Sequence, residues 1–597
     1  MPKSAAQTVS RPPAPTGAPQ TAGEMRPGVH ALSAPIYAAV PKPDFAALDR
    51  VLHVLEGQFT AGASPLALTL AANDWYLHQI NAPFRQMELA FEAACDFARL
   101  GSSAIGGPTI APEQDDRRFA HPLWQSEPYQ FWQQSFLIAD AWVKKAISGP
   151  PGIDARNQRL LSFAARQWMD MLAPSNIPWL NPEITRTTLT SMGENLKKGL
   201  TNAFDDLSDR PATGEHAVGR DLAVTPGKVV FRDHLIELIQ YAPTTPTVRP
   251  EPLLIVPAWI MKYYILDLSA ENSLIRYLVA AGHTVFCVSW RNPDASYRDV
   301  GFDDYRQSLM AAIGAVTTIC GDQKIHAAGY CLGGTLLSVT AAAMARDGDD
   351  RLASMTLFAA QTDFTEAGEL QTFVTDDQLA FLEDVMASQG YLDGKQMGGA
   401  FQLLKSRDLI WSKLIRSYWL GEDEHPSDLM AWNADTTRMP ARMHSEYLRR
   451  FFLNDDLAEG RFPAGGRPVA LADIRVPIFI VGTETDHVAP WRSVYKLTLL
   501  NSGEITFALT SGGHNAGIVS EPGHPHRHFR LHTRAEGGGY IDPDRWLDTV
   551  PMREGSWWPA WRDWLDQRSG APQEPPQTGS RDFPPLVDAP GTYVLET

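Results

Sequence analysis

Residues 325–337 read Ile-His-Ala-Ala-Gly-Tyr-Cys-Leu-Gly-Gly-Thr-Leu-Leu, and an Ala/Leu/Val-rich segment continues from them through Met344. A short apolar strand that runs through G-x-C-x-G into a helix predicts a nucleophile elbow, a strained turn that presents a reactive side chain above an α/β sheet. Gly329 and Gly333 fit this turn because strand and helix backbones approach closely and leave no room for a Cβ atom. The pattern therefore predicts a fold of the α/β class with Cys331 as its nucleophile.

Cysteine at the elbow points to a particular chemistry. The N-terminus of the following helix favours a thiolate at Cys331. A thiolate suits acyl exchange with thioesters, because it is a strong nucleophile and its acyl adduct is itself a thioester of similar energy. The alternative interpretation is a buried cysteine in a glycine-rich turn.

A cysteine nucleophile needs a base, and the base needs a carboxylate that orients it. In this architecture the acid and then the histidine follow the nucleophile, each on a loop after a later strand. The apolar run at 476–482 ends just before Asp486, and the run at 504–509 ends just before His514. Chain order and strand ends therefore predict Asp486 as the acid and His514 as the base.

Two further histidines lie near these segments. His487 adjoins Asp486, but neighbours on an extended loop usually point apart, so Asp486 could hardly orient His487 while both face Cys331. We expect His514 to be the base, and a substrate-lining role stays open for His487. His326 lies inside the strand before the elbow, and we interpret it as a hydrogen-bonded core histidine.

Composition and charge limit the classes of function. A net charge of −17 argues against a nucleic-acid surface, which would carry a basic balance. The four cysteines (Cys95, Cys287, Cys320 and Cys331) form no C-x-x-C pair, so we expect free thiols in a reducing cytosol and no zinc site. No apolar run approaches the roughly eighteen residues of a membrane helix, and no secretory signal opens the sequence.

The 597 residues allow one large catalytic domain and a second region. Residues 1–43, rich in Pro, Ala, Ser and Gly, predict a disordered arm, and the apolar spacing in 44–215 predicts a helical N-terminal domain. Strand and helix patterns alternate within 216–570, which predicts a largely parallel sheet. A helical, aromatic insertion at about 363–467 is expected to cap the site. Residues 571–597 form the expected C-terminal tail.

Three segments resemble the catalytic segments of polyhydroxyalkanoate synthases. They are G-Y-C-L-G-G-T-L-L at 329–337, D-H before V-A-P-W at 486–491, and S-G-G-H-N-A-G at 511–517. Carried onto these positions, the resemblance implies Cys331 as nucleophile, Asp486 as acid and His514 as base. These are the residues that chain order selects independently.

Further stretches resemble the long, single-subunit class I synthases, among them 257–268 (P-A-W-I-M-K-Y-Y-I-L-D-L) and 288–296 (V-S-W-R-N-P-D-A-S). The similarity extends over roughly residues 85 to 567. Met261 departs from the Asn of many members, which puts a polar role at that position in doubt. The resemblance also implies two backbone N–H donors for an oxyanion, one from Leu332 and one from Trp259 in the loop after the strand at 253–256.

The resemblance implies an α/β-hydrolase-type fold and an acyltransferase that polymerises (3R)-hydroxyacyl-coenzyme A, with short-chain substrates such as 3-hydroxybutyryl-coenzyme A expected. Coenzyme A would be carrier and product, with no other cofactor. The expected partners are a second copy of the chain, the growing polyester and the surface of a polymer granule in the cytoplasm. Two alternatives stay open: a hydrolase (acyl-coenzyme A thioesterase or intracellular polyester depolymerase), and a catalytically silent granule scaffold.

Overall fold

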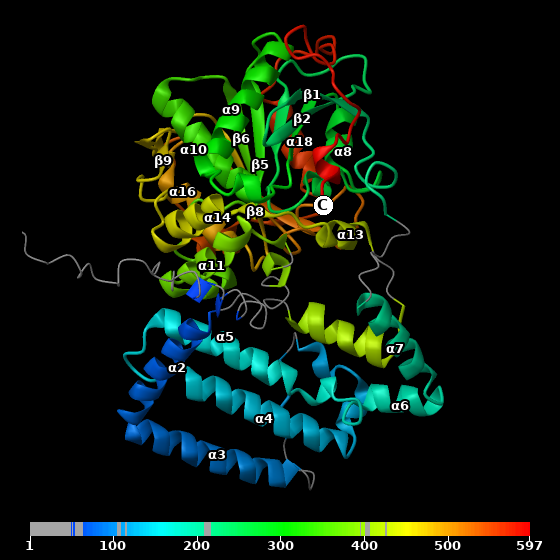
Figure 1. Cartoon of the computed structure of the whole chain (residues 1–597), viewed down its shortest axis with the longest axis vertical. Helices are drawn as coiled ribbons and strands as arrows, with labels where there is room; N and C mark the ends of the chain where they lie inside the picture. The colour runs from blue at the N-terminus through cyan, green and yellow to red at the C-terminus, as the bar shows by residue number, and fades with distance from the viewer. Residues whose placement is uncertain are drawn as a thin grey trace, which may run out of the picture. The chain divides into compact units, whose positions relative to one another are not determined.

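A computed structural model gives the three-dimensional structure of the chain (Figure 1). It describes residues 49–50, 52–53, 56, 64–103, 109–113, 116–207, 216–394, 396–399, 406–423 and 427–597. The predicted arm at 1–43 lies outside the described residues. Residues 50–597 belong to one structural unit.

A ten-stranded sheet in the described residues carries the site, with strand order β1-β2-β4-β3-β5-β6-β11-β12-β13-β14. The six strands from β4 to β12 in this order pair in parallel, and antiparallel pairs flank them on both sides. The strands are β1 (Gly227–Arg232), β2 (Ile236–Tyr241), β3 (Leu253–Val256), β4 (Val285–Trp290), β5 (Ile325–Tyr330), β6 (Leu352–Phe358), β11 (Ile478–Thr483), β12 (Ile505–Thr510), β13 (His528–Arg534) and β14 (Met552–Glu554). The structure therefore confirms the expected α/β fold with a mostly parallel sheet.

Helices cover both faces of this sheet, which explains why the parallel strands read as continuous apolar runs. Side chains alternate between two cores: Leu254 and Val256 of β3 join the core under α9 and α10, whereas Leu253 and Ile255 join the core under α8 and α18. The helices are α8 (Leu274–Ala280), α9 (Phe302–Ile319), α10 (Leu332–Asp347), α15 (Trp491–Tyr495), α16 (Leu497–Leu500), α17 (Pro543–Thr549) and α18 (Trp558–Asp566).

The segment between β6 and β11 inserts helices and short strands, and it touches the loop that follows β3. Thr437 Oγ1 donates to the main-chain oxygen of Trp259 at 2.6 Å, and Met261 forms an isolated bridge with Thr436. The insertion comprises η7 (Glu369–Phe373), α11 (Asp376–Gln389), β7 (Tyr391–Leu392), η8 (Arg407–Trp411), η9 (Leu414–Trp419), α13 (Asp428–Ala434), β8 (Met439–Pro440), α14 (Ala441–Tyr447), η10 (Leu448–Leu453), β9 (Pro463–Ala464), β10 (Arg467–Pro468) and η11 (Leu471–Asp473).

The N-terminal region is helical, and α2 to α5 lie side by side (Figure 1). Helix starts follow capping rules: the side chains of Ser64, Asp154 and Asn181 accept from the first turns of α2, α5 and α6. The elements are α2 (Pro65–Ile80), α3 (Pro83–Ser103), η2 (Arg117–Phe119), η3 (Pro122–Gln125), α4 (Tyr129–Ile147), α5 (Ala155–Met171), η4 (Pro174–Asn176), α6 (Pro182–Thr190) and α7 (Glu194–Leu207). No helix within the described residues has the length and apolar character needed to cross a membrane.

Residues 571–597 run along the edge of the sheet. Val229 of β1 donates to the main-chain oxygen of Val587 and accepts from the backbone of Leu586, both at 2.8 Å. This pairing covers backbone groups that an edge strand would otherwise leave open. The tail ends beside β2 and β4, next to the site-bearing loops.

Candidate active site

Cys331 occupies the turn between β5 and α10 in a backbone conformation that side chains seldom adopt, with φ of 53° and ψ of −124°. Two close approaches hold the turn. A Cβ atom on Gly333 would lie 2.1 Å from the main-chain oxygen of Val256, and one on Gly329 would lie 2.4 Å from the Cα of Gly334. The backbone N–H of Cys331 donates to Phe358 of β6 at 2.9 Å. The elbow expected from the sequence is thus present, with Cys331 at its apex.

Asp486 and His514 meet from two loops at the same edge of the sheet. Asp486 follows β11 and His514 follows β12, and Oδ2 of Asp486 lies 2.8 Å from Nδ1 of His514. The carboxylate is fully buried and also accepts from Thr483 Oγ1 at 2.9 Å and from the backbone N–H groups of Val488 and Ala489 at 2.8 Å. These donors fix the carboxylate, so it can hold the imidazole in one orientation through Nδ1.

The electrostatics of this pair favour its charged state. Burial alone would raise the pKa of Asp486, but the charge and hydrogen bond of His514, with the two backbone donors, lower it below its ordinary value. Burial would likewise lower the pKa of His514, but the carboxylate of Asp486 and the sulfur of Cys331 outweigh it and raise the pKa well above its ordinary value. His514 can therefore hold a proton taken from the Cys331 thiol.

Tyr330 and Asn515 complete the surroundings of the base. The ring of Tyr330 stacks on the ring of His514, and its hydroxyl donates to Asn515 Oδ1 at 2.6 Å. Burial raises the pKa of Tyr330, so the hydroxyl keeps its proton. No pattern in the sequence predicts a site role for either residue, although each adjoins a triad residue in the chain.

A cavity of about 690 Å³ opens onto Cys331 and His514. Three sets of residues line it: the loop after β3, the insertion, and the loops that hold the triad. They include Ala258, Ile260, Met261, Lys262, Ile265, Met397, Leu409, Trp432, Asn433, Thr485, His487, His514 and Cys331. The largely apolar walls beside a nucleophile suit an acyl chain.

The two expected oxyanion donors, Leu332 and Trp259, each adjoin residues that line this cavity. Leu332 is the first residue of α10, so its N–H has no acceptor within the helix. Trp259 lies in the loop after β3, and its neighbours Ala258 and Ile260 line the cavity. The Trp259 indole is buried in the core, 4.9 Å from the ring of Tyr305.

His487 and His326 lie in different surroundings. His487 lines the cavity, whereas the hydrogen bond to Asp486 Oδ2 comes from His514. His326 is buried, with its ring nitrogens 2.7 Å from Ser354 Oγ and 3.1 Å from Ser569 Oγ. Burial lowers the pKa of His326 to about 4, which confirms a neutral core histidine. Within the described residues, no group of three or more His, Cys, Asp and Glu side chains is arranged to hold a metal ion.

Family models match three parts of the chain. Residues 43–85 match "poly-beta-hydroxybutyrate polymerase N terminal", residues 115–278 match "poly-beta-hydroxybutyrate polymerase (PhaC) N-terminus", and residues 251–521 match "alpha/beta hydrolase fold". The last range holds Cys331, Asp486 and His514.

Curated relatives cover most of the chain. The poly(3-hydroxyalkanoate) polymerase of Methylorubrum extorquens is 38% identical over 565 residues, which is 91% of this chain and 92% of that protein. The poly(3-hydroxyalkanoate) polymerase subunit PhaC of Rhizobium etli is 37% identical, over 83% of this chain and 79% of that protein. The subunit PhaC of Cupriavidus necator is 37% identical, over 84% of this chain and 86% of that protein. The likeness thus extends beyond the sheet-bearing region into the helical one.

Proposed function

The chain belongs to the poly(3-hydroxyalkanoate) polymerase family, and we propose that it builds polyhydroxyalkanoate from 3-hydroxyacyl-coenzyme A through a thioester on Cys331. One observation carries the proposal: a cysteine on a strained elbow shares a cavity with a histidine whose Nδ1 lies 2.8 Å from a buried carboxylate. This arrangement is a nucleophile with a base that is itself oriented.

In the first step, His514 accepts the thiol proton of Cys331, and the sulfur attacks the carbonyl carbon of the substrate thioester. The N–H groups of Leu332 and Trp259 stabilise the negative charge that develops on the carbonyl oxygen. The bond to coenzyme A breaks, and the departing thiolate takes the proton from His514. The acyl group is then held on Cys331 as a new thioester, so one thioester has replaced another.

In the second step, the 3-hydroxyl of another monomer or chain attacks the acyl group on Cys331. His514, or the Asp486–His514 pair, accepts the hydroxyl proton as the ester bond forms. The Cys331 sulfur leaves and takes this proton back, which restores the thiol. Repetition yields a polyester with one coenzyme A released per unit, and the chemistry needs no metal or organic cofactor.

An assay with 3-hydroxybutyryl-coenzyme A tests this proposal. We expect coenzyme A release and polymer formation to rise together in proportion. After a brief reaction, the peptide that contains Cys331 should be heavier by the mass of one acyl group. Coenzyme A release without polymer would instead indicate a thioesterase. If neither coenzyme A release nor polymer were detected, the scaffold alternative would remain.

We propose a preference for short-chain substrates, supported by the "poly-beta-hydroxybutyrate" description of two matching family models. Comparing kcat/KM for 3-hydroxybutyryl- and 3-hydroxyoctanoyl-coenzyme A measures this preference. A higher value for the longer substrate would contradict it.

We also propose that the enzyme acts as a homodimer on the surface of polymer granules in the cytoplasm. Supporting this, one side of α3 exposes Phe84, Met87 and Phe91 by 82%, 67% and 71%, at the spacing of a single helical face. An exposed apolar face suits a water-insoluble polyester. Sedimentation in the presence and absence of substrate, with and without isolated granules, tests both parts.

A further inference from the structure

Glu596 lies between the loops that follow β3 and β4, which are neighbouring strands of the sheet. Its carboxylate accepts from Arg291 Nε and from the backbone N–H of Asn292, both at 3.1 Å, and these residues directly follow β4. Its main-chain oxygen accepts from Lys262 Nζ at 2.5 Å, in the loop after β3. A single residue thus joins the β3 loop to the β4 loop.

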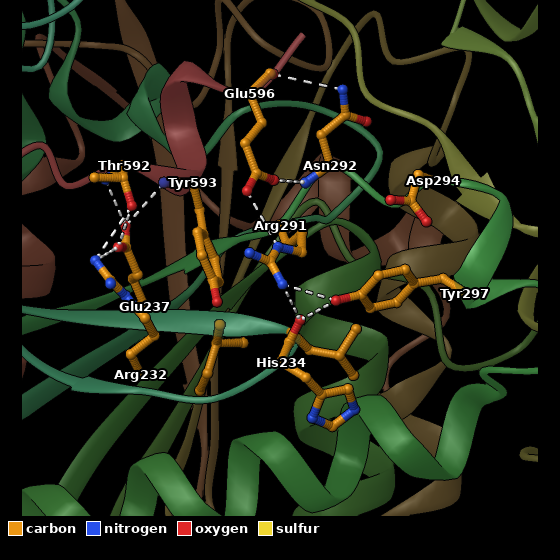
Figure 2. Close-up of polar contacts among 12 residues, drawn as sticks. Arg232, His234, Glu237, Arg291, Asn292, Asp294, Tyr297, Thr592, Tyr593 and Glu596 are labelled. Atoms are coloured by element: carbon orange, nitrogen blue, oxygen red, sulfur yellow. Dashed lines mark hydrogen bonds and ion pairs between the residues drawn. The ribbon is translucent and has the colours of Figure 1, made fainter.

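The segment that carries Glu596 is also anchored on β2. The buried carboxylate of Glu237 accepts from the backbone N–H groups of Thr592 at 2.8 Å and Tyr593 at 3.0 Å. The ring of Tyr593 lies 4.1 Å from the guanidinium carbon of Arg291 (Figure 2). These contacts fix the position of Glu596, so the β3 loop, which binds to it, can be held in place.

Lys262 connects Glu596 to the cavity. Its side chain is only 3% exposed and lines the cavity that contains Cys331. A buried ammonium needs acceptors, so the Glu596 carbonyl constrains where the side chain can lie. On the other side, Trp432 of the insertion donates through Nε1 to the main-chain oxygen of Lys262 at 2.7 Å. Hydrogen bonds therefore hold both the side chain and the backbone of Lys262.

Lys262 lies three residues after Trp259, one of the two proposed oxyanion donors. We infer that Glu596 is a positioning residue for the acyl transfer. Its carboxylate, bound to Arg291 and Asn292, fixes its main-chain oxygen, and through Lys262 that oxygen holds the loop 257–262 so that the Trp259 N–H points at the reacting carbonyl. This inference rests on the proposed function, which assigns that N–H its role. A donor must lie within about 2.7–3.1 Å of the developing oxyanion, so a small shift of the loop weakens it.

The test compares two reactions of Cys331 that differ in their need for an oxyanion donor. Thioester turnover passes through an oxyanion, whereas alkylation by iodoacetamide needs only the thiolate. We would measure kcat and KM for coenzyme A release from 3-hydroxybutyryl-coenzyme A, and follow alkylation of the Cys331 peptide by mass spectrometry. The variants are Glu596→Ala, Glu596→Gln, Lys262→Met and the double variant Glu596→Ala/Lys262→Met. Glu574→Gln, at an exposed position of the same tail, is the matched control.

We expect Lys262→Met to lower kcat roughly tenfold, less than the 10²–10³ that loss of an oxyanion donor costs. Glu596→Ala keeps the main-chain acceptor and removes only the side-chain contacts that fix it, so it should lower kcat several-fold, with little change in KM. Glu596→Gln should lose less, because an amide oxygen replaces one of the two acceptors. The rate of Cys331 alkylation should stay within about twofold of that of the unaltered chain. The kcat of the double variant should be no lower than that of the slower single variant, because the two residues act in series.

Three results would overturn the inference: unchanged kcat in Glu596→Ala, a parallel loss of turnover and alkylation, or additive losses in the double variant. The proposed function fails on a different result. If Cys331→Ala still turned over the thioester, the covalent route would be wrong whatever Glu596 did.

Discussion

The ring of Tyr330 lies stacked on the ring of His514, with centroids 5.6 Å apart and planes inclined by 29°, while its hydroxyl donates to Asn515 Oδ1. Tyr330, the residue before the proposed nucleophile, thus packs against the proposed base. Tyr330→Phe keeps the stacking and removes the hydrogen bond, whose net contribution is about 1 kcal/mol. We expect kcat for coenzyme A release to fall several-fold, with polymer yield falling in proportion. A loss as large as that of a triad variant would mean that the hydroxyl takes part in the chemistry itself.

The second prediction concerns the nucleophile. Cys331→Ala should abolish both coenzyme A release and polymer formation, because no other side chain occupies the elbow. Cys331→Ser should retain at most a small residual rate, since an alkoxide is much harder to generate than a thiolate. Both variants should unfold at the same temperature as the unaltered chain, which a thermal melt would check. Turnover by the alanine variant above the uncatalysed rate would remove Cys331 from the mechanism.

The third prediction compares the two histidines beside the site. His514→Gln should lower kcat by roughly 10²–10⁴, the usual contribution of a general base. His487→Gln is the matched control, since the same substitution there alters only a residue of the cavity wall, and it should affect KM more than kcat. If instead the His487 variant lost more of kcat, the base would have to be reassigned to that residue.

The fourth prediction follows from the raised pKa of His514. A histidine whose folded-state pKa lies above its unfolded value stabilises the fold fully below about pH 6.5, and this stabilisation disappears as pH rises through the folded-state pKa. Asp486→Asn removes the carboxylate that attracts the proton. The gap in thermal midpoint between the unaltered chain and this variant should therefore be largest at or below about pH 6.5 and shrink as the pH rises through the raised pKa of His514. A gap that grew with pH would contradict the ion pair.

Local patterns in the sequence predict much of this site, for reasons that the structure makes clear. Asp486 and His514 could be found because each follows an apolar strand, and parallel strands bring such loops to one edge of the sheet. The Tyr330–Asn515 and Lys262–Glu596 contacts join residues 185 and 334 positions apart, and no local spacing indicates them. The sequence predicts only a C-terminal tail at 571–597, yet this segment pairs with β1 through backbone hydrogen bonds that any residue other than proline can donate.

The last prediction concerns the exposed face of α3. Phe84→Ser combined with Phe91→Ser should leave the fold intact, because both side chains are largely exposed. If this face docks on the polymer, binding to isolated granules should fall clearly, because about 25 cal/mol is lost for each Å² of apolar surface no longer buried there. Initial coenzyme A release from dissolved substrate should not change, since α3 contributes no residue to the cavity. Leu499→Ser in α16, at another exposed apolar position (56%), is the control and should bind granules normally. Equal granule binding by the α3 variant and the control would assign docking to another surface.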